Sequence, residues 1–533
     1  MTSHHQTTSA TGSFLSSPAG LASWVGASDH KRIGVLYLAT SLLFLAVAVL
    51  LGLALRLEVA TASGGMFSAE GFREVLSLRT SLLVFLVATP ALVGGLGNMV
   101  LPQMIGAQGV KFPGLNRLSY YAYLVGGVLL VADGGVRGGD LSAGVVGASL
   151  AGFSGFLLGV NFLATLHLMR APGVCWTRVP MFAWSIYAVS VLNVLLAPLL
   201  GLATALAVAV HLWTGSEAPL LGVGPVLVDH VGWFQGGAAL YVLAIPVVGI
   251  VSDVVAVHAR RRLAGYHALA FCCLTMAMLG SLSWSQSVIV GGASVQALAA
   301  RSFVTFLLVV PALVMIGALV ATLHRSSIRL STPMWYALAC LIMLTAGVLV
   351  GLFPATLAVG VHLGATAFGR AFESYMLMGG VVLALFAGLY HWWPQLTGRL
   401  YDDKAGHWGC LLLFVGFSVA FFSDLVMGSQ GMPAGVSGFG SASPEMADLF
   451  LNGALVAVSG ACLAAAGFFL ALATLVRSML SGATAEANPW NGESLEWRTA
   501  SPPPTENFVE VPVCEHGPYE FEELEDLQRG AAS

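Results

Sequence analysis

Stretches of apolar residues, each long enough to cross a lipid bilayer, recur along most of this chain. A membrane-spanning helix needs about 20 consecutive and mainly apolar residues. We predict twelve such stretches: 33–56, 80–102, 118–132, 143–168, 180–211, 227–257, 267–291, 302–323, 334–358, 371–396, 408–428 and 449–477. The pattern therefore predicts an all-α polytopic membrane protein with twelve transmembrane helices.

The composition excludes most other classes of protein. Hydrophobic residues make up 57% of the 533 residues, charged residues make up only 9%, and the mean hydropathy is +0.85. A soluble domain carries about 25% charged residues, so this chain has too few to cover several water-facing domains. The net charge of −4 gives no indication of nucleic-acid binding. Seven cysteines without a Cys-x-x-Cys pair indicate neither a disulfide framework nor a thiolate metal site.

The basic residues divide unequally between the two sides of the predicted bundle. With twelve spans, both termini and every connection from an even to an odd span share one side. Sixteen of the 22 Lys and Arg residues lie on that side, and the other side has six: Arg56, Arg73, Arg79, Arg137, Arg301 and Arg370. Because cytoplasmic loops collect Lys and Arg, the pattern predicts that both termini are cytoplasmic.

Polar segments flank the predicted bundle at both ends. Residues 1–30 are small and polar and lack the pattern of a signal peptide, which predicts a flexible cytoplasmic tail. Residues 479–533 are also polar, with prolines at 502–504 and an acidic stretch from Glu520 to Glu525. They predict a second solvated tail on the cytoplasmic side, too short to form a domain. The membrane domain is expected to span residues 31–478.

Several motifs occur in a characteristic order over residues 29–521. They include Asp29-His-Lys-Arg-Ile-Gly-Val-Leu-Tyr, Gly94-Gly-Leu-Gly-Asn-Met-Val-Leu-Pro, Tyr390-His-Trp-Trp-Pro-Gln-Leu-Thr-Gly-Arg, Gly428-Ser-Gln-Gly-Met-Pro and Asn488-Pro-Trp-Asn-Gly-Glu-Ser-Leu-Glu-Trp. Together they resemble subunit I of the haem–copper cytochrome c oxidases. The resemblance implies that family's twelve-helix bundle and a place in a bacterial inner membrane. It also implies oxygen reduction at a haem iron facing a copper, with a second haem feeding electrons.

The resemblance further implies six metal-binding histidines, and this chain has another residue at each position. The haem-ligand positions hold Arg79, Phe372 and Ser374, and the copper-ligand positions hold Gly237, Gln286 and Ser287. Iron and copper in these sites are bound by neutral imidazole, which none of these residues provides. We therefore expect no catalytic residue, no metal site and no bound cofactor, although the family would bind two haems and copper.

Other family residues are retained, and some charged residues are new. Four aromatic residues match the family and are expected to serve as scaffold: Trp233, Tyr241, Trp284 and Tyr375. Arg79, Arg370 and Glu373 are charged residues in or near spans, where charge is costly unless it is paired or hydrated. One hypothesis is an intramembrane polar cluster in which Glu373 pairs with Arg79 or Arg370. The alternative is that both arginines only reach the outer interface.

The substitutions at the ligand positions favour a non-catalytic homologue of oxidase subunit I. Such a chain would be a structural, assembly or regulatory subunit, and its partner would be a subunit I with intact histidines or other respiratory subunits. One alternative is a chain that remains part of an active oxidase through unrecognised ligands. Another is a membrane channel or transporter that uses the interior of the bundle. The expected surroundings are the lipid bilayer, without nucleic acid.

Overall fold

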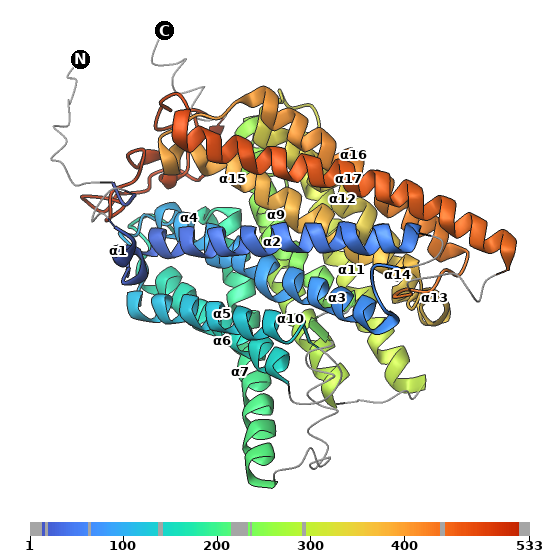
Figure 1. Ribbon diagram of the computed structural model, residues 1–533. Helices are drawn as coiled ribbons and strands as arrows, with labels where there is room; N and C mark the ends of the chain where they lie inside the picture. The colour runs from blue at the N-terminus through green and yellow to red at the C-terminus, as the bar shows by residue number, and fades with distance from the viewer. Residues whose placement is uncertain are drawn as a thin grey trace.

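Long helices packed side by side make up the described part of the chain (Figure 1). The structure is a computed structural model and describes residues 13–15, 20–61, 65–136, 142–214, 233–234, 237–289, 295–436 and 443–521. Over these ranges the chain forms helices and no strand. Twelve helical segments are long and apolar enough to cross a membrane. The prediction of an all-α bundle with twelve spans is confirmed.

The first six spans follow one another along the chain. They are α2 (His30–Ala60), the continuous segment of α3 (Ala69–Ser81), η1 (Leu82–Ala88), η2 (Pro90–Gly97) and α4 (Asn98–Met104), then α5 (Pro113–Ala132), α6 (Ala143–Leu168), α7 (Met181–Thr214) and α9 (Gly237–Ala259). The predicted sixth span begins at residue 227, and its first residues lie outside the described ranges.

The remaining six spans complete the bundle. They are α10 (Tyr266–Ile289), α11 (Val295–Leu323), α12 (Thr332–Ala355), the continuous segment of α14 (Ala367–Ser374), η4 (Tyr375–Val382) and α15 (Leu383–Thr397), then α16 (Asp403–Ser429) and α17 (Pro444–Ser481). The short helix α13 (Leu357–Leu363) joins α12 to the tenth span. Residues 290–291, at the end of the predicted seventh span, are not among those described.

Most helices extend beyond the predicted apolar stretches, because polar caps set their ends. The side chain of Asp29 accepts a hydrogen bond of 2.9 Å from the backbone N–H of Lys31 and so begins α2. Ser142 and Ser443 cap α6 and α17 in the same way. A side chain at this position satisfies an N–H group of the first helical turn that has no partner within the helix. The caps of α2 and α17 therefore add first turns that the predicted stretches 33–56 and 449–477 do not include, whereas α6 begins at residue 143 as predicted.

Two spans contain wide π-helical turns. In the second span these are η1 and η2, and in the tenth span they are η4. Every residue of these three segments is buried. Such turns are rare and often lie at functional sites. Here they directly follow the helices that carry the substituted haem-ligand positions.

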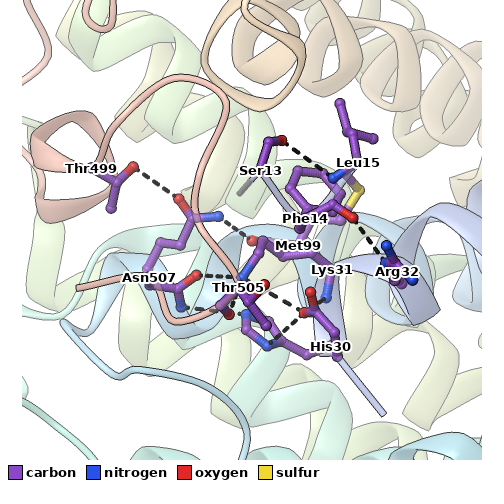
Figure 2. Close-up of polar contacts among 12 residues, drawn as sticks. Ser13, Phe14, Leu15, His30, Lys31, Arg32, Met99, Thr499, Thr505 and Asn507 are labelled. Carbon is purple, nitrogen blue, oxygen red and sulfur yellow. Dashed lines mark hydrogen bonds and ion pairs between the residues drawn. The ribbon is translucent and has the colours of Figure 1, made fainter. Parts of the chain in front are cut away.

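The C-terminal tail packs on the end of the bundle where α2 begins (Figure 2). Lys31 is fully buried, and its Nζ donates to the carbonyl oxygen of Thr505 at 2.8 Å and to Oδ1 of Asn507 at 2.9 Å. Asn507 Nδ2 donates in turn to the carbonyl oxygen of Ala107.

The N-terminal segment takes part in the same region, since Arg32 Nε donates to the carbonyl oxygen of Phe14 at 2.8 Å. The short helix α1 (Leu21–Val25) lies next to Arg32. The described parts of both terminal segments thus lie at one end of the bundle.

Large apolar side chains of the tail are buried against the spans. They are Trp490, Leu495, Trp497, Phe508, Tyr519 and Phe521. The indole N–H of Trp490 donates to the carbonyl oxygen of His391 at 2.8 Å, and the phenol of Tyr519 donates to Asp253. The tail up to residue 521 is therefore packed, where the sequence predicts a solvated segment. The boundaries at residues 30 and 478 stay predictions.

Candidate functional site

Three of the six family ligand positions lie in neighbouring helices at the opposite end of the bundle from the tail. Arg79 is in the last turn of α3, and Phe372 and Ser374 are in the short helix α14. Arg79 and Ser374 line the same cavity. Gly237 begins α9, while Gln286 and Ser287 belong to α10. For Gly237, Gln286 and Ser287 the structure describes only the position along the helix.

A cluster of charged side chains surrounds Arg79. Arg56 near the end of α2 makes a bidentate contact with Asp424 of α16, with Nη1–Oδ1 at 3.2 Å and Nη2–Oδ2 at 2.6 Å. Arg370 of α14 lies with Nη2 at 3.8 Å from Oδ1 of the same carboxylate. The side chain of Asp424 is 1% exposed, so both contacts are shielded from solvent. We call Arg56, Arg79, Arg370, Glu373 and Asp424 the charged cluster.

Glu373 lies in this region, but its carboxylate makes no direct contact with Arg79 or Arg370. It interacts electrostatically with Arg370 and, more weakly, with Arg79. Among the described residues, no ion pair within 4.0 Å joins Glu373 to either arginine. The carboxylate that directly contacts Arg56 and Arg370 is that of Asp424, which the sequence analysis missed. A lone acidic residue inside the apolar stretch 408–428 was the available signal, because such a residue must find a partner.

Arg79 is held against the backbone of α2. A Cβ atom added to Gly52 would lie 2.7 Å from Arg79 Nε, so the guanidinium group occupies space that any other residue would fill. The Nε atom of Arg79 is buried and finds no hydrogen-bond partner among the described residues. Gly52, Arg56 and Arg79 together line two adjacent cavities.

Retained aromatic residues pack around the other substituted positions. The rings of Tyr241 and Phe372 are in contact with centroids 5.4 Å apart, and both side chains are buried. Space beside them is tight, since a Cβ atom added to Gly351 would overlap both rings. Tyr375 packs edge-on against Phe421 with centroids 5.2 Å apart.

The two retained tryptophans are also buried. Trp233 donates through its indole N–H to Oγ of Ser283 at 3.2 Å. Trp284 is 7% exposed. Burial in a packed interior is what a scaffold role requires, and the roles of these aromatic residues stay predictions.

The side chains at the described ligand positions do not fit the histidine set that the resemblance implies. Arg79 carries a guanidinium group, which stays protonated and offers no lone pair to a metal. Phe372 has only a hydrocarbon ring, and Ser374 has a neutral hydroxyl group. In the described part of the chain, no group of three or more His, Cys, Asp or Glu residues is arranged to hold a metal ion.

Comparisons with known proteins match almost the whole chain. The family profile described as cytochrome c and quinol oxidase polypeptide I matches residues 32–462. Cytochrome c oxidase subunit 1 of Thermostichus vulcanus is 32% identical over 511 residues, which covers 92% of this chain and 91% of the relative. Cytochrome c oxidase subunit 1 of Bacillus subtilis is 31% identical over 504 residues, which covers 91% of this chain and 80% of the relative.

A solved structure shows the same fold. It is a cryo-EM structure of a heme-copper terminal oxidase dimer, with a TM-score of 0.67 and 13% sequence identity, and it covers 94% of this chain and 98% of that chain. This similarity shows the shared fold, and the family profile and the bacterial relatives agree with a multi-span membrane protein.

These matches correct the prediction that no cofactor is expected. The profile and the relatives are those of cytochrome c oxidases, and the structural neighbour is a haem–copper oxidase. The family binds haem and copper, and the prediction is therefore wrong. It extended an argument about six ligand positions to the cofactor content of the whole chain. The residues found at six positions do not by themselves decide whether the chain binds a cofactor.

Three observations agree on the place of this chain among known proteins. The motifs extend over residues 29–521, the bundle has twelve spans, and relatives more than 30% identical cover over nine-tenths of the chain. The chain belongs to the family of cytochrome c and quinol oxidase polypeptide I.

Proposed function

We propose that this chain is a non-catalytic member of its family and acts as a structural, assembly or regulatory subunit of a respiratory complex. The complex lies in a bacterial inner membrane, with both termini of the chain in the cytoplasm. The partner is a subunit I that carries the six histidines, or other respiratory subunits. Function depends on the residues of the site and not on the fold alone. Membership of the family therefore does not by itself make the chain catalytic.

The contact between Tyr241 and Phe372 is the observation that carries the proposal. Phe372 stands where the resemblance implies a haem-ligating histidine, and its ring lies 5.4 Å from that of Tyr241. The phenol oxygen of Tyr241 is buried without a hydrogen-bond partner in the described part of the chain. A phenyl ring neither binds iron nor transfers a proton, so this pair supports packing better than it supports chemistry.

The charged cluster supports the same conclusion at the electron-feeding side of the site. Arg79 stands where the resemblance implies the haem ligand of the second span, and Ser374 stands where it implies one of the two haem ligands of the tenth. Arg79 lies among charged side chains, with Asp424 between Arg56 and Arg370. An arginine at this place provides no metal ligand, because its guanidinium group stays protonated.

Oxygen uptake by the purified chain tests the proposal. The chain would be placed in lipid nanodiscs and supplied with reduced cytochrome c or with a quinol. A relative with the six histidines, prepared in the same way, is the matched control. We expect uptake equal to the rate without protein, because residues other than histidine stand at the six positions where the resemblance implies metal ligands. Turnover comparable to that of the control would support the alternative of an active oxidase and contradict the proposal.

Affinity purification from the membranes of its own host tests the partner. A tag after residue 533 is placed well beyond Thr505 and Asn507, which contact Lys31 of α2. We expect a histidine-bearing subunit I or other respiratory subunits in amounts equal to the chain. Recovery of the chain without any respiratory subunit would contradict the proposed role. A fluorescent protein at the same terminus should fluoresce, as it does when it folds in the cytoplasm.

A further inference from the structure

Two of the seven cysteines lie where the C-terminal tail crosses the loop between the fourth and fifth spans. All seven lie within the described ranges, and five of them are buried. The two exposed ones are Cys462, which belongs to the span α17, and Cys175, which lies in the loop. Cys514 of the tail is among the buried ones. Cys175 is therefore the cysteine outside the spans that a water-soluble reagent can reach.

The tail is bound to this loop through the backbone next to both cysteines. The N–H group of Cys514 donates to the carbonyl oxygen of Pro172 at 2.9 Å. Arg178 Nη1 donates to the carbonyl oxygens of Gly173 at 3.5 Å and of Cys514 at 3.4 Å. A side chain at Gly173 would overlap the carbonyl group of Cys514. Cys175 follows two residues later, and a negative charge on it acts on the thiol of Cys514.

The surroundings of Cys175 favour its thiolate form. Its Sγ atom lies 3.1 Å from Oγ1 of Thr177. Hydrogen bonds from Thr177, above all that of its hydroxyl group, lower the pKa of Cys175 from its ordinary value of 9.0, and the guanidinium group of Arg178 acts in the same direction. The thiolate is the reactive form of a cysteine. Exposure combined with a lowered pKa is typical of redox-sensing cysteines.

Cys514 has the opposite properties. Its thiol donates to the carbonyl oxygen of His516 at 3.0 Å. Burial raises the pKa of Cys514, and the charges of Arg178 and Arg498 oppose this shift. The thiol of Cys514 is therefore shielded from direct oxidation. A shielded thiol close to a reactive one is suited to convert an oxidised partner into a disulfide.

We propose that Cys175 and Cys514 are a redox-sensitive pair that a hydroperoxide converts into a disulfide. The thiolate of Cys175 attacks one peroxide oxygen, so that an S–O bond forms and the O–O bond breaks. The hydroxide that leaves takes up the proton that Cys175 released to solvent. The sulfur of Cys514 then attacks that of Cys175, an S–S bond forms, and the S–O bond breaks. The thiol proton leaves with the second hydroxide, so two thiols and one hydrogen peroxide give one disulfide and two waters.

The disulfide fastens the tail covalently to the loop on which it lies. In a reducing compartment such bonds are transient and serve redox sensing, because thiol exchange reverses them. The spacing of the cysteines does not reveal this pair, since the loop and the tail meet only in the fold. The inference is independent of the proposed function, because thiol oxidation requires neither metal ligands nor a partner subunit.

Peptide mapping of the full chain tests the pair. The chain, purified in detergent under reducing conditions, would be freed of reductant and treated with hydrogen peroxide, and its remaining thiols would be alkylated. Cleavage after Lys and Arg places Cys175 in peptide 171–178 and Cys514 in peptide 499–529. We expect mass spectrometry to show these peptides linked within one chain, and dithiothreitol to separate them. A chain unfolded in sodium dodecyl sulfate before oxidation should lose most of the link.

Variants assign the two roles. Cys514→Ser should lose the link and let the sulfenic acid of Cys175 accumulate, where dimedone traps it. Cys175→Ser should lose the link without any dimedone adduct at Cys514. Thr177→Val should slow formation of the link by about two- to tenfold, as the loss of one hydrogen bond does. Cys462→Ser, at the exposed cysteine of α17, is the matched control and should leave the rate unchanged.

Three outcomes would overturn the proposal. The first is the absence of the link in the folded chain, whether Cys175 stays reduced or stops at the sulfenic acid. The second is a link that joins two chains instead of two segments of one chain. The third is an equal yield of the link in the folded and the unfolded chain. All three are measured on the unaltered chain, so a variant that does not fold leaves the decision unaffected.

Discussion

Arg56 and Asp424 connect the first and eleventh spans by two parallel hydrogen bonds, of 3.2 and 2.6 Å. The geometry is bidentate, which is the strongest arrangement that a guanidinium and a carboxylate can make. Asp424 is almost fully buried and Arg56 is 19% exposed, so solvent screens the pair only weakly. The pair also has a third member, because Arg370 approaches the same carboxylate.

Substitution of Asp424 should destabilise the bundle. Asp424→Asn removes the charge that compensates Arg56 and Arg370, and breaking a buried pair on one side costs about 3–5 kcal/mol. We expect a lower midpoint of thermal unfolding in detergent, followed by tryptophan fluorescence. Asp448→Asn is the control, since Asp448 is an exposed carboxyl group of α17. Equal midpoints for the two variants would show that the pair contributes little to stability.

The buried carboxyl group of Glu496 should make the packing of the tail sensitive to pH. Burial raises the pKa of Glu496 from its ordinary value of 4.5 to about 7, and a hydrogen bond from Ser494 offsets this only in part. Because the pKa in the folded chain is the higher one, the folded chain holds the proton longer than the unfolded chain. The contribution of Glu496 to stability therefore falls as the pH rises from 4.5 to about 7, by an amount on the order of 3 kcal/mol.

Unfolding at a series of pH values checks this prediction. Glu496→Gln should remove the part of the decrease that Glu496 contributes, because the amide stays neutral at every pH. Glu493→Gln, which changes a partly exposed carboxyl group nearby, should keep it. The charge of Glu496 acts on the neighbouring buried Asp253, which remains in both variants. A slope that is the same in the two variants would assign the pH dependence to another group.

Lys31 should hold the C-terminal tail in place. Lys31→Met removes the donor to Thr505 and Asn507 and leaves their acceptors unpaired in a buried region, at about 1–3 kcal/mol for each unpaired group. We expect faster cleavage of the tail by a protease added to the detergent-solubilised chain. Lys111→Met, at an exposed lysine, is the control and should leave the rate unchanged.

Close packing of α16 on α17 depends on Gly416. A Cβ atom there would lie 2.4 Å from the backbone nitrogen of Ala464, so the helices must separate to admit a side chain. Small residues that let helix backbones approach are a common basis of packing between membrane spans. Gly416→Leu should cost at least about 2 kcal/mol and lower the unfolding midpoint. Gly317→Leu should not, because it meets open space.

The fold could be predicted from the sequence because its main signal is local. Each span is marked by its own apolar residues, and the bilayer fixes the length that such a stretch must have. The ends of the helices were less predictable, because caps such as Asp29 and Ser443 lie outside the apolar stretches. The burial of the tail depends on contacts between residues more than 400 positions apart, such as Lys31 and Asn507, which no local pattern reveals.

The site was predictable only in part. Arg79 and Glu373 were identified as charges inside spans, but the direct partner Asp424 was not, because a pairing between distant helices is a property of their packing. The position of Gly52 beneath Arg79 has the same origin. The prediction about cofactors failed for a different reason. It inferred the absence of a cofactor from substitutions at ligand positions, whereas the matched family consists of oxidases that bind haem and copper.

The contact of Lys31 with Asn507 also constrains the biosynthesis of the chain. The two residues are 476 positions apart, and the twelfth of the described spans ends between them, so the ribosome synthesises the acceptor only after the last span. Lys31 enters the membrane insertion machinery with the first span and must remain hydrated until residues 505–507 arrive. Its final burial therefore follows the synthesis of all twelve spans. A chain truncated before residue 505 would insert all twelve spans and still leave the start of the first one open to water.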